Sequence, residues 1–160
     1  IFDNFVKEVN VEGISVDLAA WDNICAEGYE NLRRLSYEDA HILLICFDVS
    51  MPDSLDNIIE AWNPEANQRL KGVPKILVGC KSDLRIIPEA TGPNESIVHS
   101  GENVGRQIGA LAYFETSAVE QQNVAELFQY AAKAALVKNA AKQKKGIRRF
   151  LSRSDIKFRA

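Results

Sequence analysis

The sequence has few cysteines and histidines and no long apolar run, and each shortage excludes a class of protein. Its 160 residues include three cysteines, two histidines and one methionine. The cysteines, at positions 25, 46 and 80, have no metal-ligand spacing and leave an odd thiol, which favours a reducing, intracellular compartment over a disulfide framework. The longest apolar run, residues 42–47, is far shorter than the roughly 20 residues that cross a bilayer.

Hydrophobic residues make up 46% of the chain and charged residues 26%, which is typical of one folded soluble domain. The net charge of −3 conceals an asymmetry. Residues 138–160 contain nine of the 19 basic residues and one acid, so this tail carries +8 and residues 1–137 carry −11. The acidic body excludes general nucleic-acid binding. We therefore divide the chain into a domain, 1–137, and a basic tail, 138–160, which is either a solvated end or a contact to an anionic membrane surface.

Apolar patterning predicts a β-hairpin followed by alternating buried strands and helices. The turn residues Glu12-Gly13 separate two strand-like runs, and the second run alternates apolar and polar residues. Pro64 should bend or end the helix before it, and the breakers in residues 87–100 indicate a loop. The pattern indicates a doubly wound α/β fold, with strands at 2–9, 14–21, 41–47, 75–79 and 112–115 and helices at 52–62, 103–108 and 124–135.

Polar side chains follow two of the buried strands, at the edge where such folds bind ligands. An Asp83 carboxylate there can accept two parallel hydrogen bonds from the N1–H and exocyclic amine of guanine, whereas adenine presents an acceptor in place of N1–H. The stem of Lys81 can lie along the ring face, and the N–H of Ala118 can reach the guanine carbonyl. A Lys-x-Asp after one strand is a weak signal. Its pairing with Ser117-Ala118 after the next strand strengthens the prediction.

From Ile1 to about Val137 the chain resembles the Rho family of small GTPases. The resemblance implies a Ras-like G domain, which is a P-loop NTPase fold with a mostly parallel six-stranded sheet and helices on both faces. It also implies binding of GTP or GDP with Mg²⁺, slow GTP hydrolysis, and signalling to effectors, exchange factors and GTPase-activating proteins in actin organisation and polarity. The residues that carry the resemblance are Phe2-Asp3-Asn4-Phe5, Trp21-Asp22, Tyr29-Glu30-Asn31-Leu32-Arg33, Leu35-Ser36-Tyr37, Asp53-Ser54-Leu55-Asp56-Asn57, Leu77-Val78-Gly79-Cys80-Lys81-Ser82-Asp83-Leu84-Arg85 and Glu115-Thr116-Ser117-Ala118.

The resemblance assigns two groups of site residues. Asp22 matches the family residue that holds Mg²⁺ through a water, and Cys25 stands at a phosphate-contacting position in switch II. The guanine base would be contacted by Cys80, Lys81, Asp83, Ser117 and Ala118.

The chain departs from the family where phosphate is bound. None of its nine glycines is followed by lysine, so these residues contain no Gly-x-x-x-x-Gly-Lys-Ser/Thr loop. The resemblance thus implies that the first strand, phosphate loop and first helix are absent from this chain, and that the switch I threonine falls before Ile1.

Switch II also departs from the family pattern. The family sequence Trp-Asp-Thr-Ala-Gly-Gln-Glu is here Trp21-Asp22-Asn23-Ile24-Cys25-Ala26-Glu27. Cys25 replaces the glycine whose N–H meets the γ-phosphate, and Ala26 replaces the glutamine that orients the attacking water. We predict impaired hydrolysis and no catalytic residue at position 26. A gene-model error over residues 23–26 would look the same.

Two function classes remain open at this stage. One is a Rho-type GTP/GDP switch impaired in phosphate binding and hydrolysis, and the other is a non-catalytic interaction module, or pseudo-GTPase. A non-functional gene fragment is a third reading. No cysteine follows Cys80, so a prenylation motif is not expected and membrane contact would be peripheral to an otherwise cytoplasmic protein. Cys46 is predicted to be a core residue, and Trp21 is equally consistent with an exposed recognition aromatic or a packed one.

Overall fold

The computed structural model describes residues 3–23, 25–26, 28–85 and 95–153, with the side chains of 95–99 and 139–153 left out of the description. In chain order the elements are β1 (Asp3–Val11), β2 (Ile14–Asp22), α1 (Glu30–Leu35), β3 (Leu43–Asp48), α2 (Pro52–Asn57), η1 (Ile58–Trp62), α3 (Asn63–Arg69), β4 (Lys75–Cys80), η2 (Ser82–Leu84), α4 (Glu95–Gln107), β5 (Ala112–Thr116) and α5 (Val124–Arg153).

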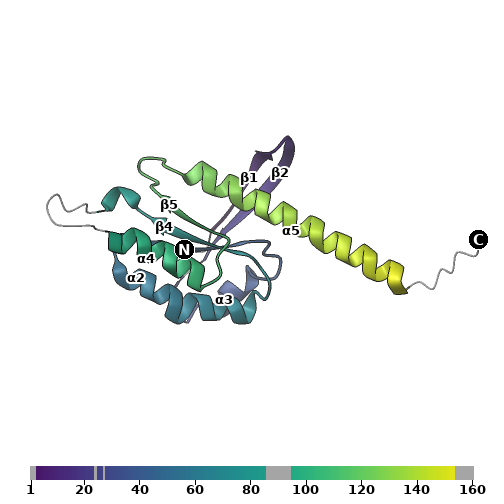
Figure 1. The fold of residues 1–160 in the computed structure, drawn as a ribbon, viewed down its shortest axis with the longest axis horizontal. Helices are drawn as coiled ribbons and strands as arrows, with labels where there is room; N and C mark the ends of the chain where they lie inside the picture. Colours follow the sequence, from purple (N-terminus) through teal and green to yellow (C-terminus); the bar gives the residue numbers. More distant parts are fainter. Residues whose placement is uncertain (1–2, 24, 27, 86–94, 154–160) are drawn as a thin grey trace, which may run out of the picture.

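A parallel sheet in the order β3-β4-β5 forms the centre of the molecule. Helices α2, α3 and α4 lie on one face of this sheet and α5 lies on the other (Figure 1). A strand that helices cover on both faces needs apolar side chains on both faces. The strand β4 meets this need with Ile76, Leu77 and Val78, which are fully or almost fully buried. The α/β fold with a parallel sheet and helices on both faces is confirmed.

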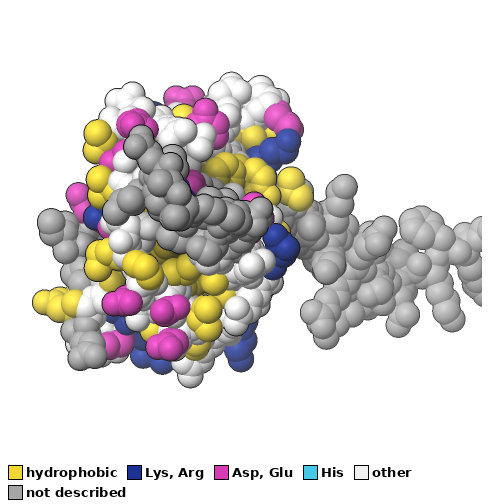
Figure 2. Space-filling model, turned by 60° about the vertical axis from the view of Figure 1, so that its left-hand side comes forward, with side chains coloured by type: hydrophobic (Ala, Val, Ile, Leu, Met, Phe, Trp, Pro, Cys, Tyr) yellow, Lys and Arg dark blue, Asp and Glu magenta, His cyan; other side chains and the backbone are white. Residues whose placement is uncertain are grey.

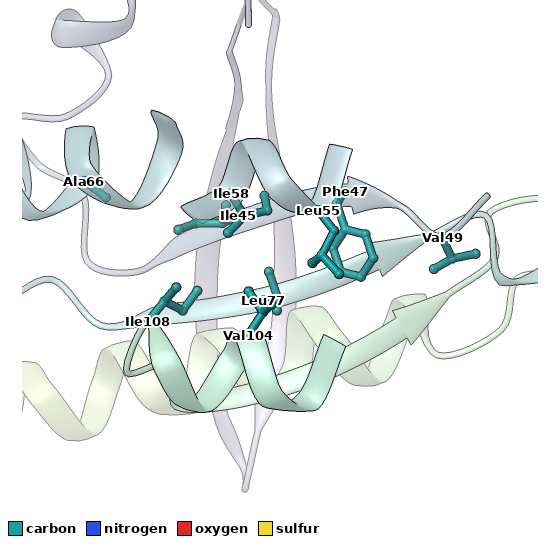
Figure 3. Packing of buried hydrophobic residues seen from close by; sticks show 9 residues of the cluster. All are labelled: Ile45, Phe47, Val49, Leu55, Ile58, Ala66, Leu77, Val104 and Ile108. Carbon is teal, nitrogen blue, oxygen red and sulfur yellow. The ribbon is translucent and has the colours of Figure 1, made fainter. Parts of the chain in front are cut away.

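The core divides between the two faces of the sheet because successive strand residues point in opposite directions. Leu77 points toward α4, where it meets Val104 and Ile108 (Figure 3). Ile76 and Val78 form a second cluster with residues of α5, namely Leu127 and Ala131.

The predicted hairpin is confirmed and forms a sheet of its own. β1 and β2 pair antiparallel, and the turn residues Glu12 and Gly13 have φ of 53° and 85°. Two positive φ values match a two-residue turn whose twist suits the flanking strands. The hairpin packs against α5, where the rings of Phe5 and Phe128 lie 6.2 Å apart and Lys133 pairs with Glu12.

Of the two outcomes predicted at Pro64, the helix does not end there. The π-helical turn η1 precedes α3 and changes the hydrogen-bond pattern where proline has no N–H to donate. One local prediction was wrong. Helix α4 begins at Glu95, eight residues earlier than predicted. The breakers Pro88, Gly92, Pro93 and Asn94 all precede Glu95, and the part of the predicted loop at 86–94 lies outside the described residues.

Cys46 is exposed, contrary to the predicted core position. It pairs in register with Val78 and so shares the sheet face that α5 covers. However, α5 packs over the middle strand, β4, and Cys46 lies on the neighbouring strand β3, which is one of the two edges of the described sheet.

The strand β2 of the hairpin also has one free side, because it pairs only with β1 among the described residues.

Helix α5 is 30 residues long, or roughly 45 Å at 1.5 Å per residue. It continues past residue 138 and projects beyond the body of the molecule (Figure 1). Among the described residues, no helix is both long enough and apolar enough to cross a membrane.

Candidate functional site

Three parallel strands end together at one edge of the sheet. The register aligns their last residues, because Asp48 of β3 pairs with Cys80 of β4 and Cys80 pairs with Thr116 of β5. Figure 2 shows the molecule with the left-hand side of Figure 1 brought forward, and both acidic (magenta) and hydrophobic (yellow) side chains lie on this face. The two strand ends that carry the polar residues therefore lie side by side at this edge.

Asp83 and Ser117 are in direct contact across this edge. The Ser117 hydroxyl donates to Asp83 Oδ1 at 2.5 Å, and the Glu120 N–H donates to the same Ser117 oxygen at 3.1 Å. Ser117 is completely buried while Asp83 is exposed. Within the described residues, Asp83 Oδ2 makes no hydrogen bond. A carboxylate that is fixed through one oxygen on an exposed residue can accept donors from a planar ligand through the other.

Ala118 follows Ser117 on an exposed turn. Two backbone hydrogen bonds close this turn, from Ser117 N to Gln122 O at 3.2 Å and from Gln122 N to Ser117 O at 2.9 Å. The Ala118 N–H has no acceptor among the described residues, so a ligand carbonyl can use it without breaking an existing hydrogen bond.

Lys81 occupies a left-handed backbone conformation, with φ 60° and ψ 43°, directly before η2. Its Nζ lies 2.7 Å from Asp48 Oδ2. The other oxygen of Asp48 accepts from Ser50, at 2.8 Å from the backbone N and 2.6 Å from the hydroxyl. The pKa of Asp48 is lowered to about 2, chiefly by the contact with Lys81 and next by the two hydrogen bonds from Ser50. Sequence reasoning missed Asp48, although an acid that ends an apolar strand is a signal for it.

Cys80 is half-buried and packs against the core cluster beneath α5. Hydrogen bonding to the Cys46 thiol and then to the Thr116 hydroxyl lowers the pKa of Cys80 to about 7, against the opposing effect of burial. The structure thus places Cys80 under the edge, with a thiol that ionises more readily than an ordinary cysteine.

The predicted switch II residues lie apart from this group. Asp22 ends β2 and is exposed, and Cys25 is exposed with its Sγ 3.7 Å from Asn23 O. Partial desolvation of its thiol by neighbouring groups is the main cause that raises the pKa of Cys25, so this thiol is not activated. Neither Asp22 nor Cys25 hydrogen-bonds to the five predicted base-contacting residues. Residues 24 and 27 lie outside the described part of the chain.

A buried arginine that sequence reasoning missed anchors the segment after Asp22. Arg33 is 5% exposed and forms a two-pronged ion pair with Glu65 of α3, through Nε at 3.2 Å and Nη2 at 3.1 Å. Its Nη1 donates to Ala26 O at 3.1 Å, and its guanidinium lies 5.4 Å from the centre of the Trp62 ring. Tyr37 also donates to Glu65, at 2.7 Å.

The residues present fit the base of a guanine nucleotide better than its metal. Asp83, Ala118 and Lys81 supply an acceptor, a donor and an apolar stem at one edge. No group of three or more His, Cys, Asp or Glu side chains that could hold a metal occurs in the described ranges. Asp22 is one carboxylate, and Mg²⁺ bound to nucleotides takes much of its coordination from phosphate oxygens and water.

Comparison with known proteins gives the family. The model of the Ras family matches residues 1–137. "GTP-binding protein RHO1" of Candida albicans is 44% identical over 151 residues, which cover 91% of this chain and 76% of that protein. "GTP-binding protein rho1" of Schizosaccharomyces pombe is 43% identical over 90% of the chain and 74% of its own length, and the RHO1 protein of Saccharomyces cerevisiae is 43% identical over 86% and 68%. This chain therefore belongs to the Ras family of small GTPases, with similarity to Rho-type members.

Proposed function

We propose that this chain binds guanine nucleotides through the base-contacting edge and is impaired in phosphate binding and GTP hydrolysis. The contact between Ser117 and Asp83 carries the proposal, because it fixes a carboxylate beside an unused backbone donor. Rho-type family members bind GTP or GDP with Mg²⁺ and signal to effectors under the control of exchange factors and GTPase-activating proteins. We place this chain in that signalling class.

Base selectivity follows from the donor and acceptor pattern at the edge. Asp83 accepts from the N1–H and exocyclic amine of guanine, and the Ala118 N–H donates to the guanine carbonyl. Adenine reverses this pattern and leaves Asp83 facing an acceptor. Because an unpaired charged group is costly, such a site discriminates strongly between the two bases.

Hydrolysis is impaired because of the side chains at positions 25 and 26. The methyl group of Ala26 has no polar atom to orient an attacking water. The Cys25 side chain crowds a position where the family places glycine against the γ-phosphate. No glycine of the 160 residues is followed by lysine, so contacts to the base dominate the affinity that these residues provide.

The unpaired edges of β2 and β3 support a further part of the proposal. In the family fold a central strand that leads into the phosphate loop lies between the strands equivalent to β2 and β3. Both edges lack a strand partner among the described residues. If a strand carrying a phosphate loop completes the sheet at this position, phosphate binding is restored and hydrolysis is not.

An interaction module is the second candidate. The Arg33–Glu65 ion pair and the hydrogen bond from Arg33 to Ala26 O hold Ala26 and residues 28–37 against α3. Three large apolar side chains of this segment are exposed, namely Tyr29, Leu32 and Leu35. Trp21 of β2 is also 48% exposed. A surface held in this way can receive effectors or regulators. The basic tail would add peripheral contact to an anionic membrane from a cytoplasmic location.

The variant Asp83→Asn tests base recognition. Asparagine offers an N–H donor to the second carbonyl of xanthine and cannot accept both guanine donors. We expect Asp83→Asn to weaken GDP binding at least tenfold and to strengthen binding of xanthosine diphosphate, measured by competition against a fluorescent nucleotide. Asp56→Asn is the matched control, since it removes the same charge from exposed α2. Equal GDP affinity of Asp83→Asn and the unsubstituted chain would contradict the proposal.

A further inference from the structure

An ion pair joins the ends of β3 and β4 at the proposed base site. Asp48 Oδ2 lies 2.7 Å from Lys81 Nζ, and the two residues are contributed by adjacent strands. The side chain of Asp48 is 14% exposed, whereas that of Lys81 is 59% exposed. One partner is therefore held by the protein and the other extends over its surface.

Asp48 is fixed at both its backbone and its carboxylate. Its N–H donates to the Ser54 hydroxyl at 3.0 Å, and the single proton of that hydroxyl lies between the Asp48 carbonyl at 3.0 Å and the Met51 carbonyl at 2.6 Å. The carboxylate accepts two hydrogen bonds from Ser50. A carboxylate held in this way defines where the Lys81 ammonium comes to rest.

Lys81 by itself is poorly restrained. A lysine side chain has four rotatable bonds, and ordering it costs up to about 2 kcal/mol of rotamer entropy. Here the backbone fixes one end in the left-handed region and Asp48 fixes the other. Cys80 and Asp83 are the other ionisable groups that act on Lys81, and both favour its charged form.

We propose that Asp48 is a positioning residue for nucleotide binding, which holds Lys81 stretched across the strand ends so that its stem is ready to receive the guanine ring. This inference rests on the proposed function, because it assigns the base to the same edge. It adds a residue that does not touch the ligand and acts through Lys81.

The first test examines the ion pair in the free protein. We expect the ¹³Cγ resonance of Asp48 to titrate well below an ordinary aspartate in the unsubstituted chain and to move upward in Lys81→Met. Ser50→Ala, which removes one of the Ser50 donors and leaves Lys81, should move it less. An Asp48 titration that is unchanged in Lys81→Met would show that the ion pair does not form in solution and would overturn the inference.

The second test measures binding of guanosine and of GDP. If Asp48 positions Lys81, Asp48→Asn should weaken both ligands about threefold, the range of an exposed ion pair. If Asp48 only repels phosphates, Asp48→Asn should strengthen GDP and leave guanosine unchanged, which would overturn the inference. Asp56→Asn, the charge-matched control, should alter neither affinity.

A double-mutant cycle separates positioning from a merely structural role. In the Lys81→Met background, Asp48→Asn should have no further effect on guanosine affinity, because the residue through which it acts is gone. If Asp48→Asn weakens guanosine binding as much in the Lys81→Met background as it does in the unsubstituted chain, the inference is overturned. If the unsubstituted chain binds neither guanosine nor GDP, the proposed function itself fails and the positioning role fails with it. The carboxylate titration still decides whether the ion pair exists.

Discussion

At the scale of single residues, the buried hydroxyl of Ser117 is the group on which the base site depends most directly. It donates to Asp83 Oδ1 and accepts from the Glu120 N–H, so it connects the strand end of β5 with the residues that follow β4. A buried hydroxyl with both functions satisfied orients its neighbours and stabilises the fold. Removing it affects both properties.

We predict that Ser117→Ala lowers the free energy of unfolding by about 1–2 kcal/mol and weakens GDP binding, because Asp83 loses its donor and the Glu120 N–H loses its acceptor. Urea unfolding and nucleotide competition measure the two effects. Ser82→Ala is the control, since its hydroxyl makes one longer contact, 3.4 Å from Gln122 Oε1. Equal losses in Ser82→Ala and Ser117→Ala would contradict the special role of Ser117.

At the scale of elements, the Arg33–Glu65 pair fixes the segment after β2 onto α3. Arg33 is almost completely buried and Glu65 is 23% exposed on its side chain. Loss of one partner leaves the other charge partly buried without its counter-ion, which costs more than the net contribution of the intact pair.

We predict that Arg33→Ala destabilises the chain by about 2 kcal/mol, below the usual range for fully buried pairs because water reaches Glu65. The neighbouring Arg34 is exposed and makes a matched control, for which we expect less than about 0.5 kcal/mol. Hydrogen exchange of residues 28–37 should accelerate in Arg33→Ala only. If both arginine variants unfold alike, the anchoring role is refuted.

Tyr37 supplies a pH dependence for the same anchor. Burial, followed by its hydrogen bond to Glu65, raises the pKa of Tyr37 to about 12 from an ordinary value of 10.0. As the pH rises, the unfolded chain therefore loses the Tyr37 proton before the folded chain does. The stabilisation that protonated Tyr37 gives the folded chain is complete below pH 10 and is lost as the pH rises through 12. We expect thermal melting of the unsubstituted chain to decline more steeply over this interval than melting of Tyr37→Phe. Parallel declines would show that Tyr37 does not contribute.

Local patterns predicted those elements and contacts that depend on neighbouring residues. Alternation and Glu12-Gly13 predicted the hairpin, and the polar residues after two buried strands assigned Asp83 and Ser117 to one ligand-binding edge, where the structure shows them in contact. The Arg33–Glu65 pair could not be predicted, because its partners are 32 residues apart and many charged pairs are equally compatible with the pattern. The exposure of Cys46 could not be read either, since an apolar run does not show whether its strand lies at an edge.

At the scale of the whole molecule, the described strands form two separate sheets. The edges of β2 and β3 present backbone N–H and C=O groups without strand partners among the described residues. Such edges favour pairing with other chains. The hairpin is attached mainly through α5, by the Phe5–Phe128 contact and the pair between Lys133 and Glu12.

We predict that residues 1–160 alone are marginally stable and prone to aggregate. Calorimetry should give a weak, broad transition, and light scattering should rise with protein concentration near the same temperature. A sharp, concentration-independent transition of a monomer well above room temperature would contradict this prediction.

The central claim is that the edge formed by β3, β4 and β5 recognises guanine. A titration of residues 1–160 with fluorescent GDP in the presence of Mg²⁺, competed by unlabelled GDP, GTP and ATP, tests this claim most directly. We predict saturable binding with a Kd of about 10 μM, displaced by GDP and GTP but not by ATP. Absence of saturable binding at tens of micromolar, or equal displacement by ATP, would contradict the account and leave the interaction module as the better description.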